Sequence, residues 1–566
     1  MRRTRTGVVA VLVSAMLALA GCAAMPTSGP VSVGVAGDTE QESVEPLGDP
    51  PPEDGTPEDI VRGFLGASAA GFSRSSSTEN DDFRNAREYL SGEARTSWTP
   101  RERVVVYPTA SSPQLRLDGS QVQVTVRVAA RIDADGRYDQ AGPSAEETLT
   151  FGMVQDSDGQ WRISALDDGV VLSEPNFEAI YRSSTLYFLS QDGTFLVPET
   201  RWFPLRNLAT SIVRALIAGP SPWLRDAVRT AIPEGATLQP DAVSVDADGL
   251  ATVSLAVGGL PTEPDDRSLM QAQLEASLRT ARVRTVEVSS DGVAMEPDEI
   301  TLDRGQDPGG ALEAIQGGET LVQLTHGEFV PVEGVESLDG LDLRSPARQP
   351  GGELRVALSG SARLVTLPTD AGNSQTLFTS QVALLPPSVD RLGWVWTAAE
   401  DGDELIAVSD SGDTVRLDAD WLADREVRSL RVARDASRIA VVSDGPDGVR
   451  VDVAAVVRDD SGSPQSVGAA QRVGATLSDA SRVVWVDESS LGVLGLSGSV
   501  TSEVYHLVPL AGAAEARGAI ADPVDIAGGK GDSVVYLSNT EDQIYSRSGP
   551  SWVAVADDVR YPSFAG

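Results

Sequence analysis

Cys22 is the only cysteine of the chain, and its neighbours make it a candidate for covalent modification. It directly follows a Leu-Ala-Gly triplet at 19–21, which closes an apolar run over 8–20. A basic cluster precedes this run at Arg2, Arg3 and Arg5. This order is typical of a secretory signal peptide, and the run is shorter than the ~20 residues that a membrane-spanning helix requires. Cleavage after residue 21 would place the thiol of Cys22 at the mature N-terminus, where it can be acylated.

The four residues that end at Cys22 resemble a bacterial lipobox, Leu19-Ala20-Gly21-Cys22. This resemblance implies an N-palmitoyl and S-diacylglycerol cysteine after removal of residues 1–21. Burial of each methylene contributes about 0.8 kcal/mol, and two or more acyl chains hold a protein stably on a membrane. The alternative is an ordinary signal peptide followed by a chance cysteine. We predict a lipid-anchored protein on the extracytoplasmic face of the cell membrane, with Cys22 as its lipidation site.

Other side chains with catalytic chemistry are scarce. The two histidines, His326 and His506, lie in separate stretches of the last part of the chain, and no paired-histidine or cysteine metal motif occurs. No Gly-x-Ser-x-Gly elbow or Ser-x-x-Lys motif is present. The glycine-rich stretch at 528–531 lacks the spacing and the serine or threonine of a phosphate-binding loop, so it is predicted to be a turn. We predict a protein without catalytic residues, metal ligands or cofactor.

Carboxylates are the one abundant reactive group, with 83 acidic residues. Two of them flanking a sugar bond would suffice for a glycosidase, but no pattern singles out a pair. Calcium-like Asp-Ala-Asp-Gly sequences occur at 133–136 and 246–249. Neither has the terminal glutamate of a calcium-binding loop, and both lie between alternating apolar residues. They are therefore predicted to be hairpin turns.

Composition separates a polar segment from the folded part. Residues 22–55 are rich in Pro, Gly, Ser and acids and have few large apolar side chains, so they are predicted to form a flexible tether. The formal net charge of the whole chain is -38. This charge repels nucleic acid and anionic lipid headgroups, which argues against either as a direct partner of the folded part.

Residues 56–175 have the pattern of an α+β domain. Thr56 is suited to cap a helix, with Pro57 at the first helical position and acids in the first turn. A second short helix is expected at 81–89, and Asp-Gly pairs at 135–136 and 158–159 predict hairpin turns. Strands are expected at 104–107, 122–130, 148–154 and 161–166. Two helices before a curved antiparallel sheet resemble the cone of the nuclear transport factor 2 superfamily, here without a histidine for catalysis.

Residues 184–305 predict a second α+β domain with two hairpins and two amphipathic helices. Its characteristic sequences are Leu-Tyr-Phe-Leu at 186–189, Ile-Ala-Gly-Pro at 217–220, Ala-Ile-Pro-Glu-Gly at 231–235 and Asp-Gly-Leu-Ala at 248–251. They resemble a GerMN domain, a module of envelope and sporulation proteins. This resemblance implies binding within the cell envelope.

Residues 311–566 predict a β-propeller. Short strands separated by Gly, Asp and Ser recur, and the strand, sharp turn and strand over 427–443 have weaker counterparts near 390–396 and 480–486. At ~40–45 residues per blade, the length predicts about six blades, or seven if one is built from both ends. Four tryptophans are interpreted as buried strand residues, with anchors on a propeller face as the alternative: Trp394, Trp396, Trp485 and Trp552.

Taken as a whole, the chain resembles the actinobacterial LpqB lipoprotein family. The resemblance rests on the lipobox at Cys22, the GerMN-like stretch and the segment 561–566, Tyr-Pro-Ser-Phe-Ala-Gly. It implies a membrane-anchored accessory that binds the extracytoplasmic domain of a sensor histidine kinase of the MtrAB type, in envelope homeostasis and cell division. Two alternatives remain: a passive module that binds the cell wall, and a carboxylate-dependent glycan hydrolase.

Overall fold

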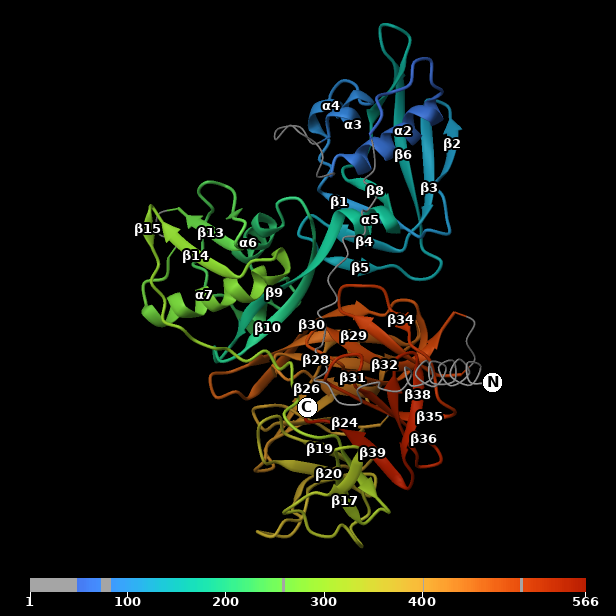
Figure 1. Ribbon diagram of the computed structural model, residues 1–566. Helices are drawn as coiled ribbons and strands as arrows, with labels where there is room; N and C mark the ends of the chain where they lie inside the picture. Colours follow the sequence, from blue (N-terminus) through green and yellow to red (C-terminus); the bar gives the residue numbers. More distant parts are fainter. Residues whose placement is uncertain (1–47, 73–82, 257–259, 401, 499–501) are drawn as a thin grey trace, which may run out of the picture. The chain divides into compact units, whose positions relative to one another are not determined.

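The computed structural model describes residues 48–72, 83–256, 260–400, 402–498 and 502–566 (Figure 1). The signal peptide, Cys22 and most of the predicted tether lie outside these residues. Within the described part of the chain, no helix has the length and hydrophobicity needed to cross a membrane. Two α+β domains and a β-propeller follow one another along the sequence, as predicted.

The first domain contains two four-stranded sheets, in the orders β5-β4-β1-β8 and β2-β3-β6-β7. Its elements are α2 (Pro57–Ala70), α3 (Arg84–Glu88), α4 (Ala94–Ser97), β1 (Arg103–Tyr107), β2 (Gln114–Asp118), β3 (Gln121–Arg127), β4 (Ala130–Asp133), β5 (Tyr138–Gln140), β6 (Glu146–Gln155), β7 (Trp161–Ala165), β8 (Val170–Ser173) and α5 (Glu174–Ile180). The prediction of one antiparallel sheet is wrong in two respects. The strand expected at 122–130 is interrupted at 128–129, where the chain passes from one sheet to the other, and β1 pairs with β8 in parallel.

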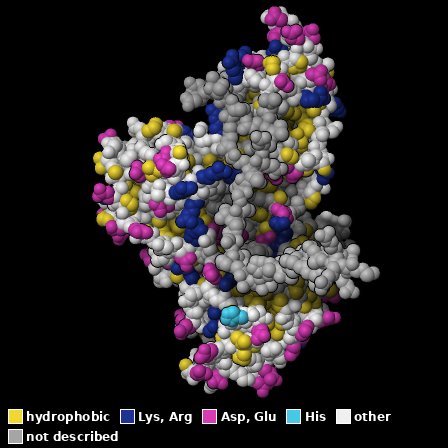
Figure 2. All heavy atoms as spheres, in the orientation of Figure 1, with side chains coloured by type: hydrophobic (Ala, Val, Ile, Leu, Met, Phe, Trp, Pro, Cys, Tyr) yellow, Lys and Arg dark blue, Asp and Glu magenta, His cyan; other side chains and the backbone are white. Residues whose placement is uncertain are grey.

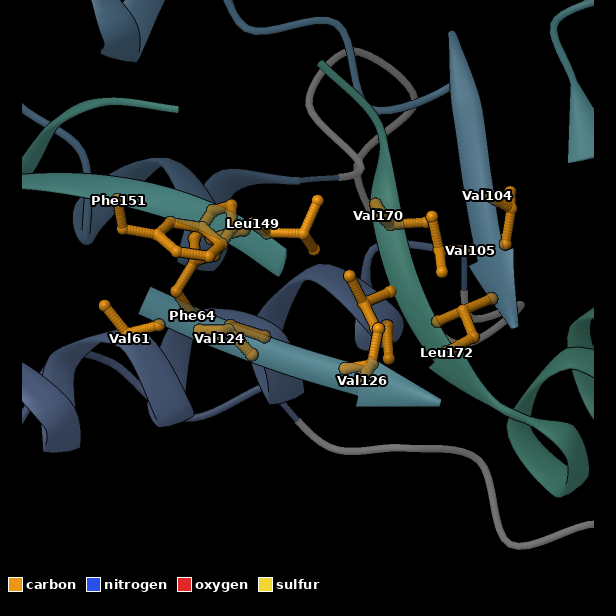
Figure 3. Close-up of a cluster of buried hydrophobic side chains, with 14 of the residues drawn as sticks. Val61, Phe64, Val104, Val105, Val124, Val126, Leu149, Phe151, Val170 and Leu172 are labelled. Atoms are coloured by element: carbon orange, nitrogen blue, oxygen red, sulfur yellow. The ribbon is translucent and has the colours of Figure 1, made fainter. Parts of the chain in front are cut away.

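Helix α2 is the central packing element of this domain. Thr56 and Asp59 form a capping box, in which each side chain accepts a hydrogen bond from the backbone of the other. The helix contacts strands of both sheets, and its apolar face enters their shared core (Figure 3). Phe64 lies there at the centre, with its ring centroid 5.1 Å from that of Trp98 and 6.0 Å from that of Phe151. The core therefore forms where one helix joins the two sheets.

The second domain has the predicted two hairpins and two helices. Its elements are β9 (Tyr181–Ser190), β10 (Leu196–Pro204), α6 (Leu208–Ala218), β11 (Val228–Arg229), β12 (Ser244–Val245), β13 (Leu250–Leu255), α7 (Pro264–Leu278), β14 (Thr285–Ser290) and β15 (Val293–Ala294). They form two sheets, β10-β9-β11 and β12-β13-β14-β15. Strands β13 and β14 pair in parallel because α7 connects them. Both helices contribute to a single apolar core with β9 and β13.

The described residues of the last domain form six four-stranded sheets, the blades of a propeller. The strands are β16 (Glu313–Gln316), β17 (Thr320–Thr325), β18 (Glu328–Pro331), β19 (Leu343–Arg348), β20 (Arg355–Ser359), β21 (Arg363–Thr366), β22 (Thr376–Thr379), β23 (Ser388–Val389), β24 (Val395–Ala398), β25 (Leu405–Val408), β26 (Thr414–Leu417), β27 (Glu426–Val432), β28 (Arg438–Asp444), β29 (Arg450–Arg458), β30 (Pro464–Val473), β31 (Leu477–Trp485), β32 (Ser490–Ser497), β33 (Val504–Pro509), β34 (Glu515–Ala516), β35 (Pro523–Gly528), β36 (Val535–Asn539), β37 (Ile544–Ser548), β38 (Ser551–Ala556) and β39 (Val559–Ser563).

One blade is built from both ends of the domain. Strand β39 pairs with β16, and the blade order is β18-β17-β16-β39. The inner strands contact their neighbours in the closed cycle β39, β19, β23, β27, β31 and β35. The blade made from both ends is thus one of the six.

Candidate functional site

The predicted lipidation site, Cys22, lies outside the described residues, but the end of the predicted tether does not. The Asn85 side-chain amide donates a hydrogen bond to the carbonyl of Gly48 at 2.6 Å. The backbone N–H of Asp54 donates to the Gln160 side-chain oxygen at 2.7 Å. Residues 48–55 therefore contact the first domain, which leaves 22–47 between Cys22 and the folded part.

The two histidines lie in different blades and in different environments. His326 has a left-handed backbone, with φ of 52°, in the turn between β17 and β18. His506 in β33 is 1% exposed, and burial lowers its pKa. Its Nε2 lies 2.9 Å from the Ser497 hydroxyl, and its Nδ1 lies 3.1 Å from the Val504 carbonyl. A ring so enclosed packs within its blade rather than reaching a substrate.

The aspartates that begin the turns at 133–136 and 246–249 accept hydrogen bonds from the backbone of their own turns. The Asp133 carboxylate accepts hydrogen bonds from the N–H groups of Asp135 and Arg137. Asp246 accepts in the same way from Asp248 and Leu250. Among the residues that the structure describes, no group of three potential metal ligands comes together. The prediction of hairpin turns at both places is confirmed, and the acidic side chains in Figure 2 are dispersed over the visible face.

The propeller tryptophans are mainly part of its packing. Trp396 is fully buried, and its indole N–H donates to Asp390 at 2.9 Å. Trp485 is buried and donates to the Arg431 carbonyl at 3.0 Å. Trp394 and Trp552 are half-buried. The interpretation as strand residues is confirmed for the two buried rings.

The second domain contacts the propeller at the turns that follow the inner strands. The Tyr187 hydroxyl donates to Glu488 at 2.7 Å, and burial raises the pKa of this phenol. Arg391 pairs with Asp192, with a nitrogen to oxygen distance of 2.8 Å. These residues come from β9, its following turn and two blade turns. Sequence analysis missed this contact because no spacing links its members.

Arg438 is the most deeply buried charge at this contact. It is 1% exposed and forms an ion pair with Asp435 at 2.6 Å. Its guanidinium also donates to the carbonyl of Glu488 at 2.8 Å and lies over the Trp485 ring, 4.7 Å from the centroid. A further bond of 3.4 Å reaches the carbonyl of Pro198 in the second domain. One side chain therefore joins two blades to the neighbouring domain.

Three domain families match successive parts of the chain. The lipoprotein LpqB N-terminal domain matches residues 50–178, the sporulation and spore germination family called Germane matches 185–296, and the lipoprotein LpqB beta-propeller domain matches 319–565. This chain belongs to the LpqB lipoprotein family. The resemblances to LpqB and to a GerMN-type domain are thereby confirmed.

Proteins named lipoprotein LpqB are similar to this chain over most of their length. The protein from Streptomyces coelicolor is 29% identical and covers 98% of this chain and 97% of its own. The protein from Thermobifida fusca is 27% identical over 94% of each chain. The protein from Mycolicibacterium smegmatis is 27% identical over 77% of this chain and 78% of its own. For the first two of these proteins, the similarity extends over all three domains of this chain.

Asp452 is expected to make the stability of the propeller in this LpqB family member depend on pH. Its side chain is 4% exposed, and one carboxyl oxygen has no hydrogen-bond partner among the described residues. Burial raises the pKa of Asp452 from 3.8 to about 6, although Arg450 and Arg425 oppose the shift. The folded chain therefore holds this proton more tightly than the unfolded chain does. The resulting stabilisation is complete below pH 3.8 and is lost as the pH rises through about 6.

Asp452→Asn should therefore raise the unfolding free energy of the propeller above about pH 6. Near pH 3.8, the pKa of this carboxyl in the unfolded chain, the substitution should change the unfolding free energy little. The gain at neutral pH is expected to reach at most about 3 kcal/mol, from ~1.4 kcal/mol per unit of pKa shift. Denaturant unfolding of both proteins across this pH range measures it. An equal difference in unfolding free energy at every pH would contradict the prediction.

Proposed function

We propose that this chain is a lipid-anchored, extracytoplasmic accessory of a two-component sensor kinase of the MtrAB type. It would bind the external domain of the kinase and tune signalling in envelope homeostasis and cell division, acting by contact rather than by catalysis. The observation that carries the proposal is membership of the LpqB lipoprotein family together with a lipobox that ends at Cys22.

Attachment to the membrane supplies the physical basis for such a contact. The segment 22–47 spans at most roughly 90 Å when fully extended, so residue 48, where the described part of the chain begins, would lie within that distance of the bilayer. A partner anchored in the same membrane meets them at an effective concentration on the order of mM. A contact that would be weak between proteins free in solution then suffices for regulation.

The geometry favours a partner surface away from the blade turns that contact the second domain. The second domain contacts those turns through Tyr187, Asp192 and the backbone carbonyl of Gly305, to which Arg434 donates at 3.2 Å. A kinase domain bound there would have to displace these contacts. The opposite ends of the blades and the first domain are therefore the surfaces proposed for the partner.

Crosslinking in intact cells, followed by identification of the captured membrane protein, tests the proposal. We expect the wild-type chain to capture a sensor kinase and Cys22→Ser to lose this capture. A matched control replaces the lipid on Cys22→Ser with a single spanning helix, which should restore capture because it restores confinement to the membrane.

Other results would favour the alternatives. Retention of the mature chain on purified peptidoglycan, without capture of a kinase, would support a wall-binding module. Turnover of envelope glycans by the mature chain would support a hydrolase. Either result, with unchanged kinase signalling in a strain that lacks the protein, would overturn the accessory role.

A further inference from the structure

The two ends of the propeller axis differ in how they are filled. At the ends of the inner strands, Arg434 donates to the carbonyls of Gly529 and Ala565, and a cavity of only about 40 Å³ remains. At the beginnings of the inner strands, two adjoining cavities of about 470 Å³ and 280 Å³ are open. They share four lining residues: Ser345, Pro386, Arg482 and Tyr561. We call this pair of cavities the axial mouth.

The axial mouth contains cationic groups whose hydrogen-bonding capacity is unused. Within the described part of the chain, Arg344 has no hydrogen-bond or ion-pair partner, and its Nε is buried. The Nε of Arg482 is also buried and unpartnered, while its Nη1 donates to the Ser481 carbonyl. Buried donors without acceptors are costly and uncommon in folded proteins. These two guanidinium groups therefore point to an acceptor that the chain does not supply.

Two other arginines of the axial mouth are paired with carboxylates. Arg428 pairs with Asp479 at 2.8 Å and also with Asp444, and Arg560 pairs with Asp542. Burial raises the pKa of Asp525, and the charges of Arg482 and Arg431 oppose this shift. Two further carboxylates line the wall: Glu400 and Glu426. The open cationic capacity is thus concentrated at Arg344 and Arg482.

The backbone that lines the axial mouth has two similar β-bulges, one in each of two neighbouring inner strands. Ser345 in β19 and Tyr561 in β39 both have left-handed conformations, with φ of 50° and 56°. Each precedes a proline and lies where the pairing register of its blade shifts. Non-glycine residues adopt this conformation at a cost, and bulges of this kind often re-aim side chains beside binding sites. The two bulges lie on neighbouring inner strands, where both line the mouth.

We propose that the axial mouth binds the carboxylate or phosphate group of a small anionic ligand through Arg344 and Arg482. The planar guanidinium presents parallel N–H donors that match the two oxygens of such a group. The volume of the larger cavity lies in the range of small-molecule sites. The axial mouth opens at the blade ends proposed for the kinase, but anion binding there needs neither the membrane nor a partner protein, so the two proposals can be tested separately.

Titration calorimetry on the mature chain from residue 22, produced without the signal peptide, tests the site. Citrate and inorganic phosphate are the probes, and the anion that binds more tightly distinguishes a carboxylate ligand from a phosphate ligand. Arg344→Gln and Arg482→Gln should each weaken saturable binding about tenfold or more, the loss expected for a hydrogen bond to a charged group. Arg416→Gln, an exposed residue paired with Glu404 at 2.7 Å, should leave the affinity unchanged.

Thermal unfolding separates ligand binding from a structural role. Without anion, Arg344→Gln should unfold at the same temperature as the wild type or higher, because it removes an unpartnered buried group. The better-binding anion should raise the unfolding temperature of the wild type but not of Arg344→Gln. The proposal is overturned if neither anion binds the wild type saturably, or if Arg344→Gln unfolds at a lower temperature and keeps the wild-type affinity.

Discussion

Cys22→Ser is expected to release the protein from the membrane into the soluble fraction. A serine hydroxyl cannot form the thioether through which the proposed diacylglycerol would be attached, so neither this lipid nor the later acyl group would be added. Loss of a single palmitoyl chain removes roughly 10 kcal/mol of transfer free energy, at about 0.8 kcal/mol per methylene. Retention should therefore fall by several orders of magnitude, as measured by cell fractionation and by the intact mass of the N-terminal peptide.

Ser32→Ala provides the matched control, because it lies in the same segment and leaves the thiol in place. Its membrane retention should equal that of the wild type. Wild-type protein that carries an unmodified thiol and is free in the medium would contradict the assignment of Cys22. The kinase proposal would then lose its confinement to the membrane as well.

Arg438→Ala should destabilise the propeller by about 3–5 kcal/mol, because it leaves Asp435 charged and buried without its partner. The substitution also removes the bonds to the carbonyls of Glu488 and Pro198. Chemical denaturation, followed through the propeller transition, measures the loss. Arg416→Ala removes an exposed pair with Glu404 and should cost at most about 1 kcal/mol.

A double variant tests the cause of this destabilisation. Arg438→Met with Asp435→Asn removes both charges, keeps much of the buried volume and should be more stable than Arg438→Ala alone. If the double variant is no more stable than Arg438→Ala, the unpaired charge of Asp435 does not cause the destabilisation. The loss would then come from the missing bonds between the blades and the second domain.

Local signals predicted much of the fold. The cap predicted at Thr56 forms, with Asp59 as its partner, and the strands predicted at 104–107 and 161–166 lie within one residue of β1 and β7. These features depend on residues close in sequence, such as a capping side chain or a run of apolar residues. The bend at 128–129 was missed because the apolar alternation continues through it.

Contacts between distant segments could not be predicted from these local sequence patterns. Neither the sequence of β39 nor that of β16 indicates that these two strands pair, because any strand edge of suitable register could accept β39. Arg344 and Arg482 meet only because two blades bring them to one cavity. The contacts of Arg438 also come from distant segments, so its sequence position suggests an ordinary surface charge although the side chain is buried. Cys22 could be proposed as the lipidation site because its motif is contiguous, and it lies outside the described residues.

The ring closure has a consequence for biogenesis. Glu313 pairs with Ser563, so the first blade lacks its inner strand until the C-terminal segment has left the ribosome and, in the export that we propose, has crossed the membrane. Pairing between segments so far apart in the chain slows folding. Until then the edge of β16 offers unpaired backbone groups to other chains. For an exported chain, folding of the propeller would then finish only after translocation, and we expect a polypeptide truncated before β39 to be degraded faster than the full-length chain.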